Sequence, residues 1–344
     1  MAVQNEGDAM SGEIHQVSVV IPVYQGEKTL PDLMAELDDL RTVQLSEAGH
    51  RWVIAETLCV YDHGHDDSPA VLHTLAEKYP WLKLVWLSRN FGQHAATMAG
   101  ISSSGGEWVV TIDEDGQQNP RDIGVLLDEA IRSNSTLVYA KPLNPPPHGA
   151  LRNFCSRSAK KLVSALMGSK HSVDYNSFRL ILGEVARSAS AYAGNGVYLD
   201  VALGWVAKVT TAGVYLRDEG DRQSGYSYKA LFAHFWRMTL SGGTGFLRIV
   251  STLGATVFSV GIIMAIVILI RKIMFPIIAV GWSSTIIVLL VTNGLIMLSL
   301  GIIAEYIGVA VNMAMGKPLY VVTSDPAFGP LGRKANESRQ GPVL

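Results

Sequence analysis

"VVTIDEDGQQNP" (residues 109–120) runs from an apolar, β-forming segment straight into three acids, an amide pair and a proline. Neighbouring carboxylates repel one another and lose hydration wherever they are enclosed. A strand that ends on Asp113, Glu114 and Asp115 is therefore typical of a site that receives a positive group. The alternative is an exposed acidic turn without function, because such turns are common.

The spacing of the polar residues favours a metal site. Alternate residues of an extended segment point the same way, so Asp113, Asp115 and Gln117 can offer three oxygens to one cation. Carboxylate and amide oxygens suit hard divalent ions. We expect Mg²⁺ or Mn²⁺ that bridges to substrate phosphates.

Strands alternate with helices along the first part of the chain. The predicted strands are 17–24, 51–62, 82–90 and 107–115. This alternation predicts an α/β fold with a parallel, doubly wound sheet. Ligands of such sheets bind beyond the carboxyl ends of the strands, where Asp62, Arg89 and Asn90 join the three acids. No GxGxxG or Walker loop follows these strands, which argues against dinucleotide and P-loop sites.

The composition limits the class of protein. With 344 residues, the chain is long enough for a catalytic domain and something more. A net charge of −2 gives no basic field that would attract nucleic acid. The two cysteines, Cys59 and Cys155, argue against a disulfide framework and fit a reducing compartment. Residues 1–15 lack the apolar core of a secretory signal, so we expect a disordered, cytosolic N-terminus.

Two uncharged segments, 249–270 and 273–304, follow the predicted sheet. Because a membrane-spanning helix needs about 20 apolar residues, we expect two transmembrane helices within 248–304, joined outside by 271–282. The alternative is a pair of buried helices in a soluble core. Four basic residues flank one side of the hairpin and two flank the other. This small positive-inside bias places 305–344 and the catalytic part in the cytosol.

Two further stretches combine an apolar face with basic residues. Residues 151–170 carry five basic residues and no acid, beside a partial apolar stripe. Residues 227–240 place large apolar side chains on one face and basic ones on the other. Next to a membrane hairpin we expect interfacial amphipathic helices, the second within a region that extends over 227–247. The alternative is a pair of solvated basic helices.

Several motifs together resemble a known family. They are "VSVVIPVYQGEKTL", "LSRNFGQHAATMAGI", "TIDEDGQQNPRDI", "NSFRLI" and "GIIAEYIGVAVNMAMGKPLYVV", spread over residues 15–323. This set is similar to the family 2 glycosyltransferases that load sugars onto polyprenyl phosphate, such as dolichyl-phosphate mannose synthases and bacterial undecaprenyl-phosphate glycosyltransferases. The resemblance implies a GT-A fold over 16–226, a nucleotide-sugar donor, a divalent metal and a polyprenyl-phosphate acceptor. It also implies a homo-oligomer such as a tetramer.

The resemblance assigns donor roles residue by residue. Pro22 and Tyr24 match the first nucleotide-binding turn, and Asp62 matches the second. Arg217 or Arg222 matches the loop that closes over the donor phosphates. The metal ligands implied are the three already named from their spacing.

For the acceptor phosphate, the resemblance implies Lys141, Arg152 and Ser156. We expect Asp115 and Arg152 to contribute most to catalysis. A metal held by Asp115 would stabilise the diphosphate leaving group, and a guanidinium suits the geometry of the attacking phosphate.

Three turns differ from the usual family pattern. Gly26 replaces the first acid after the first strand, and Tyr61 and His63 flank Asp62 where an Asp and a Gly are usual. Ser177 replaces the Asp that precedes "FRL". The differences concern base and sugar recognition more than the metal, and an ionised phosphate nucleophile needs no strong general base at Ser177.

The alternative at the second turn is a different metal site. His63 and His65 lie near Asp62 and Asp66 and could form a transition-metal cluster. A polar turn over the nucleotide is the simpler interpretation.

The sequence thus predicts a glycosyltransferase of the cytoplasmic membrane, with its catalytic domain facing the cytosol. It would move a hexosyl or pentosyl group from a nucleotide sugar to polyprenyl phosphate for modification of cell-envelope glycans. The alternative is a catalytically weak, membrane-anchored relative that binds a sugar nucleotide or a partner protein. A processive polysaccharide synthase fits less well, because the chain has no Q-x-x-R-W motif and only two predicted spans.

Overall fold

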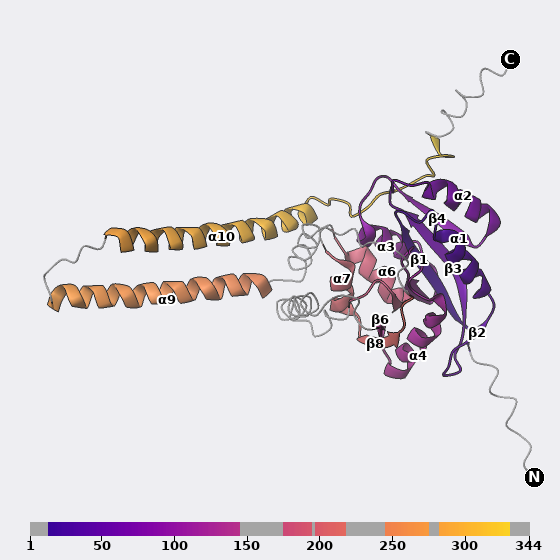
Figure 1. The fold of residues 1–344 in the computed structure, drawn as a ribbon, viewed down its shortest axis with the longest axis horizontal. Helices are drawn as coiled ribbons and strands as arrows, with labels where there is room; N and C mark the ends of the chain where they lie inside the picture. The colour runs from indigo at the N-terminus through magenta and orange to yellow at the C-terminus, as the bar shows by residue number, and fades with distance from the viewer. Residues whose placement is uncertain (1–12, 145–174, 195–196, 218–244, 275–281, 331–344) are drawn as a thin grey trace, which may run out of the picture.

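The structure, a computed structural model, describes residues 13–144, 175–194, 197–217, 245–274 and 282–330 (Figure 1). One mixed sheet carries helices on both faces, and two long helices extend away from it (Figure 1). Arg152, Ser156 and Arg222 lie outside the described residues, as do most of the predicted N-terminal segment and the predicted interfacial helices up to residue 244.

The described part of the sheet has nine strands in the order β8-β6-β7-β5-β1-β3-β4-β9, with β2 paired to β3. The strands are β1 (His15–Val23), β2 (Gln44–Leu45), β3 (Arg51–Tyr61), β4 (Leu82–Leu87), β5 (Trp108–Thr111), β6 (Leu137–Pro142), β7 (Arg179–Leu182), β8 (Val209–Val214) and β9 (Val322–Thr323). β2, β7 and β9 run against the other six. The prediction of a mostly parallel sheet is therefore confirmed.

Helices cover both faces of the sheet. They are α1 (Leu30–Asp39), α2 (Ser68–Lys78), α3 (Gln93–Ser102), α4 (Ile123–Ser133) after the 3₁₀ turn η1 (Pro120–Asp122), α6 (Gly183–Tyr192) and α7 (Leu199–Val206). β1 is buried on both sides because its residues alternate: Val19 and Ile21 pack in the core with α1, α2 and α4, and Val20 packs in the core with α3, α6 and α7.

Small residues bring α3 close to the sheet. A Cβ added at Gly100 would lie 2.4 Å from a methyl carbon of Val20, so only glycine fits there. This close packing fixes the start of α3, residue Gln93, over the carboxyl ends of the parallel strands.

The strand that carries the acids is shorter than predicted. β5 ends at Thr111, whereas the sequence predicted a strand to Asp115. The chain turns over residues 114–116 because Gly116 adopts a positive φ of 75° and the Asp115 side chain accepts a hydrogen bond from the Gln117 N–H at 3.1 Å. The acids therefore lie in a turn and not in an extended segment.

β7 lies antiparallel between β5 and β6, and its register aligns these three strands at the site. Thr111 of β5 and Tyr139 of β6 both pair with Arg179. Arg179, only 3% exposed, forms a buried ion pair with Asp200, which also accepts a hydrogen bond from the Tyr139 hydroxyl at 2.8 Å. Because buried charges need such partners, this network holds the three strands together directly beneath the acidic turn.

The C-terminal segment returns to the sheet, which the sequence did not predict. β9 pairs antiparallel with the edge strand β4, and the Ser88 N–H donates to the Val321 carbonyl oxygen at 2.9 Å. His73 of α2 lies 3.5 Å from the Asp325 carboxylate and contacts the ring of Phe328. Part of the predicted C-terminal segment is thus a strand of the catalytic sheet.

The two long helices, α9 (Gly245–Met274) and α10 (Trp282–Ala314), run side by side (Figure 1). Among the described residues, Thr292–Ala314 is the one segment long and apolar enough to cross a membrane, with a mean hydropathy of 2.0. In α9 the apolar segment is shorter, Gly254–Met264. Only 6% of the apolar stretch in α10 is buried, which disfavours the alternative of helices in a soluble core.

Candidate active site

The carboxyl ends of β1, β3 and β5 bring the predicted polar residues to one edge of the sheet. Pro22, in β1, is the residue before the last of its strand, and Tyr24 follows β1 directly. Asp62 follows β3, and Asp113 lies two residues beyond β5. β1 is the middle strand of the three, so these turns are neighbours as predicted.

Asp113 is held by uncharged donors on both of its oxygens. Gln93 of α3 donates to Oδ1 at 2.7 Å, Gln118 donates to Oδ2 at 2.9 Å, and the Ser177 hydroxyl also donates to Oδ2. Burial, with a further contribution from the charge of Asp115, raises the pKa of Asp113 despite these hydrogen bonds. Among the described residues Asp113 forms no ion pair, and the buried Arg179, which pairs with Asp200, acts on it only through its charge, which lowers its pKa.

The predicted third ligand is placed differently from the predicted pattern. The side chain of Gln118 forms two hydrogen bonds with Asp113. Its amide N–H donates to the Asp113 carboxylate, and its amide oxygen accepts the Asp113 backbone N–H, both at 2.9 Å. Gln117 lies next to Asp115 through its backbone N–H, and its carbonyl oxygen accepts the Arg217 N–H at 2.9 Å. Since the segment turns, alternation along a strand no longer decides which amide faces the acids.

Glu114 belongs to a different set of contacts from its two neighbours. Its carboxylate accepts the N–H groups of Tyr24 and Gln25, both at 2.9 Å. The three consecutive acids therefore do not share one ligand. Glu114 binds the turn after β1, and the role of Asp113 and Asp115 as metal ligands stays a prediction.

Asp62 shapes the edge of the site through the backbone. It is 3% exposed, and its two oxygens accept the N–H groups of Phe91 and Gly92 at 2.7 and 2.8 Å. The Asn90 side chain donates to the Asp62 carbonyl oxygen at 3.0 Å. Burial raises the pKa of Asp62, against the effect of those two N–H groups. Asp62 thus fixes the loop between β4 and α3, beside the turn that the resemblance assigns to the nucleotide.

The histidines of the second turn have their own partners. His63, at a positive φ of 52°, bonds through Nε2 to the Leu87 carbonyl oxygen at 2.6 Å, and the His65 ring lies edge-on to Tyr24 at 5.7 Å. A Cβ at Gly64 would lie 1.4 Å from the Tyr24 carbonyl oxygen, so the first two turns touch there. Within the described residues no three His, Cys, Asp or Glu side chains converge on a metal site, so the alternative transition-metal cluster is not formed.

Lys141 reaches the same edge from the far side of β7. It lies two residues beyond Tyr139 in β6, as Asp113 lies two beyond Thr111 in β5, and Ser177 lies two before Arg179 in β7. Lys141 is exposed. The other two predicted acceptor residues lie outside the described part of the chain.

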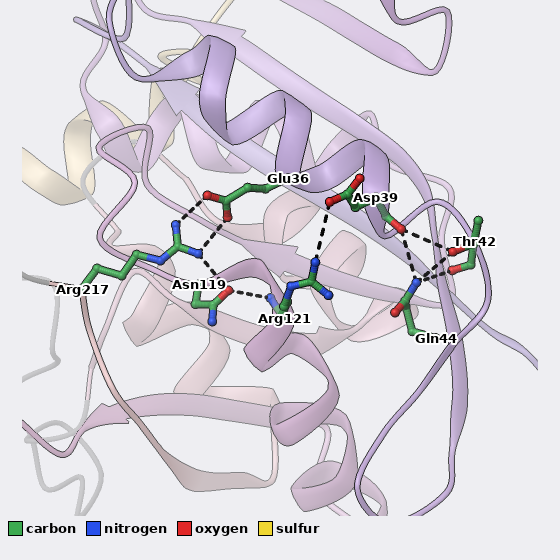
Figure 2. Close-up of polar contacts among 7 residues, drawn as sticks. All are labelled: Glu36, Asp39, Thr42, Gln44, Asn119, Arg121 and Arg217. Carbon is green, nitrogen blue, oxygen red and sulfur yellow. Dashed lines mark hydrogen bonds and ion pairs between the residues drawn. The ribbon is translucent and has the colours of Figure 1, made fainter.

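Arg217 has a partner that the sequence did not predict. Its guanidinium binds both oxygens of Glu36 of α1 at 2.8 Å and donates to Asn119 at 3.1 Å (Figure 2). Arg121, next to this group, lies 3.7 Å from the Asp39 carboxylate (Figure 2). Arg217 therefore links α1 to the loop that carries Gln117, and a role for it in binding donor phosphates stays a prediction.

Residues 18–186 match the family described as Glycosyl transferase family 2. This part of the chain is a family 2 glycosyltransferase domain. Its mostly parallel α/β sheet is of the GT-A type, as the resemblance implied.

Two curated relatives align over most of the chain. A prophage bactoprenol glucosyl transferase homolog of Escherichia coli (strain K12) is 24% identical over 318 residues, covering 89% of this chain and 98% of the relative. An undecaprenyl-phosphate 4-deoxy-4-formamido-L-arabinose transferase of Pseudomonas fluorescens (strain SBW25) is 26% identical over 317 residues, covering 90% and 89%. The similarity therefore extends past the glycosyltransferase domain into the long helices.

A solved glucosyl-3-phosphoglycerate synthase from Mycobacterium tuberculosis, in complex with Mn²⁺, UDP and phosphoglyceric acid, aligns with a TM-score of 0.46. The identity is 15%, and the alignment covers 66% of this chain and 77% of that one. A superposition this loose supports no conclusion about ligands.

The contacts of three residues at the site were not predicted from the sequence. Gln93 and Gln118 hold Asp113, and Glu114 holds the first turn. The amide pair Gln117–Gln118 was visible, but the choice between its members depends on the turn at Gly116. The partners of Glu114 are about 90 residues away, a separation that no local pattern reveals.

Proposed function

We propose that the protein transfers a sugar from a nucleotide-sugar donor to a polyprenyl phosphate. The observation that carries the proposal is that Asp113, Asp115 and Lys141 lie at the same end of the strands of a family 2 glycosyltransferase domain. The two acids call for a cation, and the exposed lysine, one strand further along, suits a phosphate. The names of the relatives, a bactoprenol glucosyl transferase homolog and an undecaprenyl-phosphate sugar transferase, support this acceptor class.

Asp113, Asp115 and Gln117 would hold Mg²⁺ or Mn²⁺. The residues fit such an ion, because among the described residues neither carboxylate forms an ion pair and Asp113 is enclosed by uncharged donors. Carboxylate and amide oxygens are the ligands that hard cations prefer. When bound, the ion offsets the negative charge that develops on the diphosphate leaving group.

On the donor side, Pro22, Tyr24 and Asp62 line the two turns that would hold the nucleotide. Tyr24 is 36% exposed, so part of its ring is available to a base or ribose. Asp62 acts through the loop from Asn90 to Gly92. Arg222, or Arg217 after release from Glu36, would bind the donor phosphates.

On the acceptor side, Lys141, Arg152 and Ser156 would orient the lipid phosphate. The phosphate oxygen is ionised near neutral pH, so it attacks the sugar without a strong base. Ser177 donates its hydroxyl hydrogen to Asp113 and would therefore position the acid rather than accept a proton.

The membrane arrangement completes the proposal. α9 and α10 would form a two-helix hairpin in the cytoplasmic membrane, with the catalytic domain on the cytosolic side. Exposed apolar side chains on both helices, such as Ile263 at 61% and Met297 at 66%, suit contact with lipid. The interfacial stretches 151–170 and 227–247 would place the site at the headgroups, and the protein would assemble as a homo-oligomer.

The test is transfer by the purified full chain with undecaprenyl phosphate and a panel of nucleotide sugars, with the lipid product identified by mass. The proposal predicts one polyprenyl-phosphate sugar, and its mass would separate a hexosyl from a pentosyl donor. Binding of a nucleotide sugar without any lipid product would favour the alternative, a catalytically weak relative.

A further inference from the structure

The middle acid of the "DED" turn joins two parts of the site that are separate in sequence. Glu114 Oε2 accepts the Tyr24 N–H and Oε1 accepts the Gln25 N–H, each at 2.9 Å. A carboxylate that receives two backbone N–H groups forms hydrogen bonds roughly twice as strong as neutral ones. The turn after β5, which carries the metal-site acids, is thereby tied to the turn after β1.

The next two N–H groups of the first turn are also bound by side chains. The Gly26 N–H donates to the Ser68 hydroxyl at 2.9 Å, and the Glu27 N–H donates to Asp66 Oδ2 at 3.0 Å. Ser68 and Asp66 belong to the loop after β3 and the start of α2. The turn from Tyr24 to Glu27 is therefore bound by residues that follow both neighbouring strands, β3 and β5. Of the four hydrogen bonds described here, the two from the β5 side are both accepted by Glu114.

Gly26 is explained by the same contact. A Cβ at this position would lie 2.8 Å from Glu114 Oε2 and 2.8 Å from Leu30 Cγ. A larger residue at position 26 would therefore require both the Glu114 carboxylate and the Leu30 side chain to move. The absence of a side chain at position 26 and the position of the Glu114 carboxylate therefore belong to one arrangement.

We propose that Glu114 is a positioning residue that sets the nucleotide-binding turn, Tyr24–Glu27, relative to the metal-site acids Asp113 and Asp115. This inference rests on the proposed function. A nucleotide sugar must reach from its base at the first turn to its diphosphate at the acids, so the separation of the two turns decides how well it fits. In this proposal Glu114 acts through the backbone of the first turn and not by direct contact with the donor.

The deciding variant is Glu114→Gln, which keeps the side-chain volume but can accept only one of the two N–H groups. We expect its Kd for the best-bound probe among UDP, GDP, dTDP and CDP, measured by calorimetry with Mg²⁺, to rise about tenfold. The donor KM should rise by a similar factor, while the acceptor KM and the unfolding temperature stay nearly unchanged. Glu77→Gln, an exposed acid on α2, is the matched control and should change none of these values.

A double-mutant cycle tests the steric half of the argument. Gly26→Ala should weaken nucleotide binding in the wild-type background and weaken it less in Glu114→Ala, because the added methyl group then meets one obstacle fewer. Equal effects in both backgrounds would contradict the link between positions 26 and 114.

Three results would overturn the proposal. Glu114→Gln could bind the nucleotide as tightly as wild type, could lose unfolding temperature with the Kd unchanged, or could fail to fold; the last two would make Glu114 a purely structural residue. Failure of the proposed function is a separate result, namely wild-type protein that binds the nucleotide but makes no lipid-linked sugar. The Kd comparison still decides the role of Glu114 in that case.

Discussion

At the scale of single residues, three adjacent acids have three different surroundings. Asp113 is enclosed by Gln93, Gln118 and Ser177, Glu114 binds the first turn, and Asp115 receives the Gln117 N–H. The same local sequence therefore carries the two proposed metal ligands and a residue that binds the backbone of the first turn. What separates the roles is the turn at Gly116, which sends neighbouring side chains to different partners.

The contact between Arg217 and Glu36 leads to a prediction about donor binding. If Arg217 acts by holding the Gln117–Asn119 loop, Arg217→Ala and Glu36→Ala should raise the donor KM by the same small factor, about twofold. The ion pair is half exposed, so each change should cost only about 0.5 kcal/mol of stability, and less in high salt. Arg132→Ala, which breaks the exposed pair with Glu129, is the control.

A different pattern would restore the predicted phosphate role of Arg217. In that case Arg217→Ala would raise the donor KM strongly, and Glu36→Ala would leave it unchanged or lower it by releasing the guanidinium. Steady-state kinetics of the two variants distinguishes a role in holding the loop from a role in binding the donor phosphates.

At the scale of elements, Glu56 of β3 connects neighbouring strands near the ends that lie opposite the site. It accepts hydrogen bonds from Ser18 of β1 at 2.7 Å and from the Gly105 N–H at 2.6 Å, and it pairs with Lys83 of β4. Burial alone would raise the pKa of Glu56, but the hydrogen bonds from Lys83, Ser18 and Gly105 outweigh it and leave the pKa below its usual value of 4.5.

A lowered pKa in the folded state makes this stabilisation dependent on pH. It is present above about pH 4.5, the value for an unperturbed glutamate, and is lost as the pH falls through the lower folded pKa. Glu56→Gln should therefore reduce the free energy of unfolding by about 2 kcal/mol at neutral pH and by less in acid. Urea unfolding at several pH values measures this, and a constant difference between the proteins would contradict it.

β9 covers the edge of β4, and its removal should weaken nucleotide binding at the candidate active site. Ending the chain after Lys317 exposes the β4 edge and frees Leu87, whose carbonyl oxygen receives His63. We expect a lower unfolding temperature, more aggregation and weaker nucleotide binding. Ending the chain after Pro330 keeps every described contact of β9 and is the control. If both shortened proteins bind nucleotide like the full chain, β9 has no influence on the site.

The sequence predicted elements well and their distant contacts poorly. The four parallel strands and the placement of Asp62 and Asp113 follow from local periodicity and from the geometry of parallel sheets. β9, the antiparallel β7 and the Glu114 contacts depend on pairing between residues far apart in the chain. Nothing in "VVTS" (residues 321–324) marks it as a partner of β4, because the edge of that strand exists only after folding.

At the scale of the whole molecule, the chain leaves the sheet, forms the α9–α10 hairpin and comes back to the sheet as β9 (Figure 1). If the hairpin crosses the membrane as proposed, both of its ends would lie on the side that holds the catalytic domain, because β9 pairs with β4. The pairing of β9 with β4 supports this arrangement independently of the basic residues that flank the hairpin. Those residues favour one orientation only slightly, with four on one side and two on the other.

Cysteine labelling tests this topology. In a version without Cys59 and Cys155, Ile278→Cys should react with an impermeant reagent added outside intact cells, and Ala327→Cys should react only after the membrane is opened. Detergent-solubilised protein, in which both positions should react, is the control. External labelling at position 327 would reverse the orientation and remove the site from the cytosolic supply of nucleotide sugars.

Metal-dependent sugar transfer at the acidic turn can be measured as the amount of lipid-linked sugar that the purified full chain makes. Wild-type protein should make the product with Mg²⁺ and lose it with EDTA. Asp115→Asn should make at least about a hundredfold less under the same conditions, because the ion loses a charged ligand, while its unfolding temperature stays unchanged. Full product formation by Asp115→Asn, or by the wild type in EDTA, would rule out metal-dependent transfer at this turn.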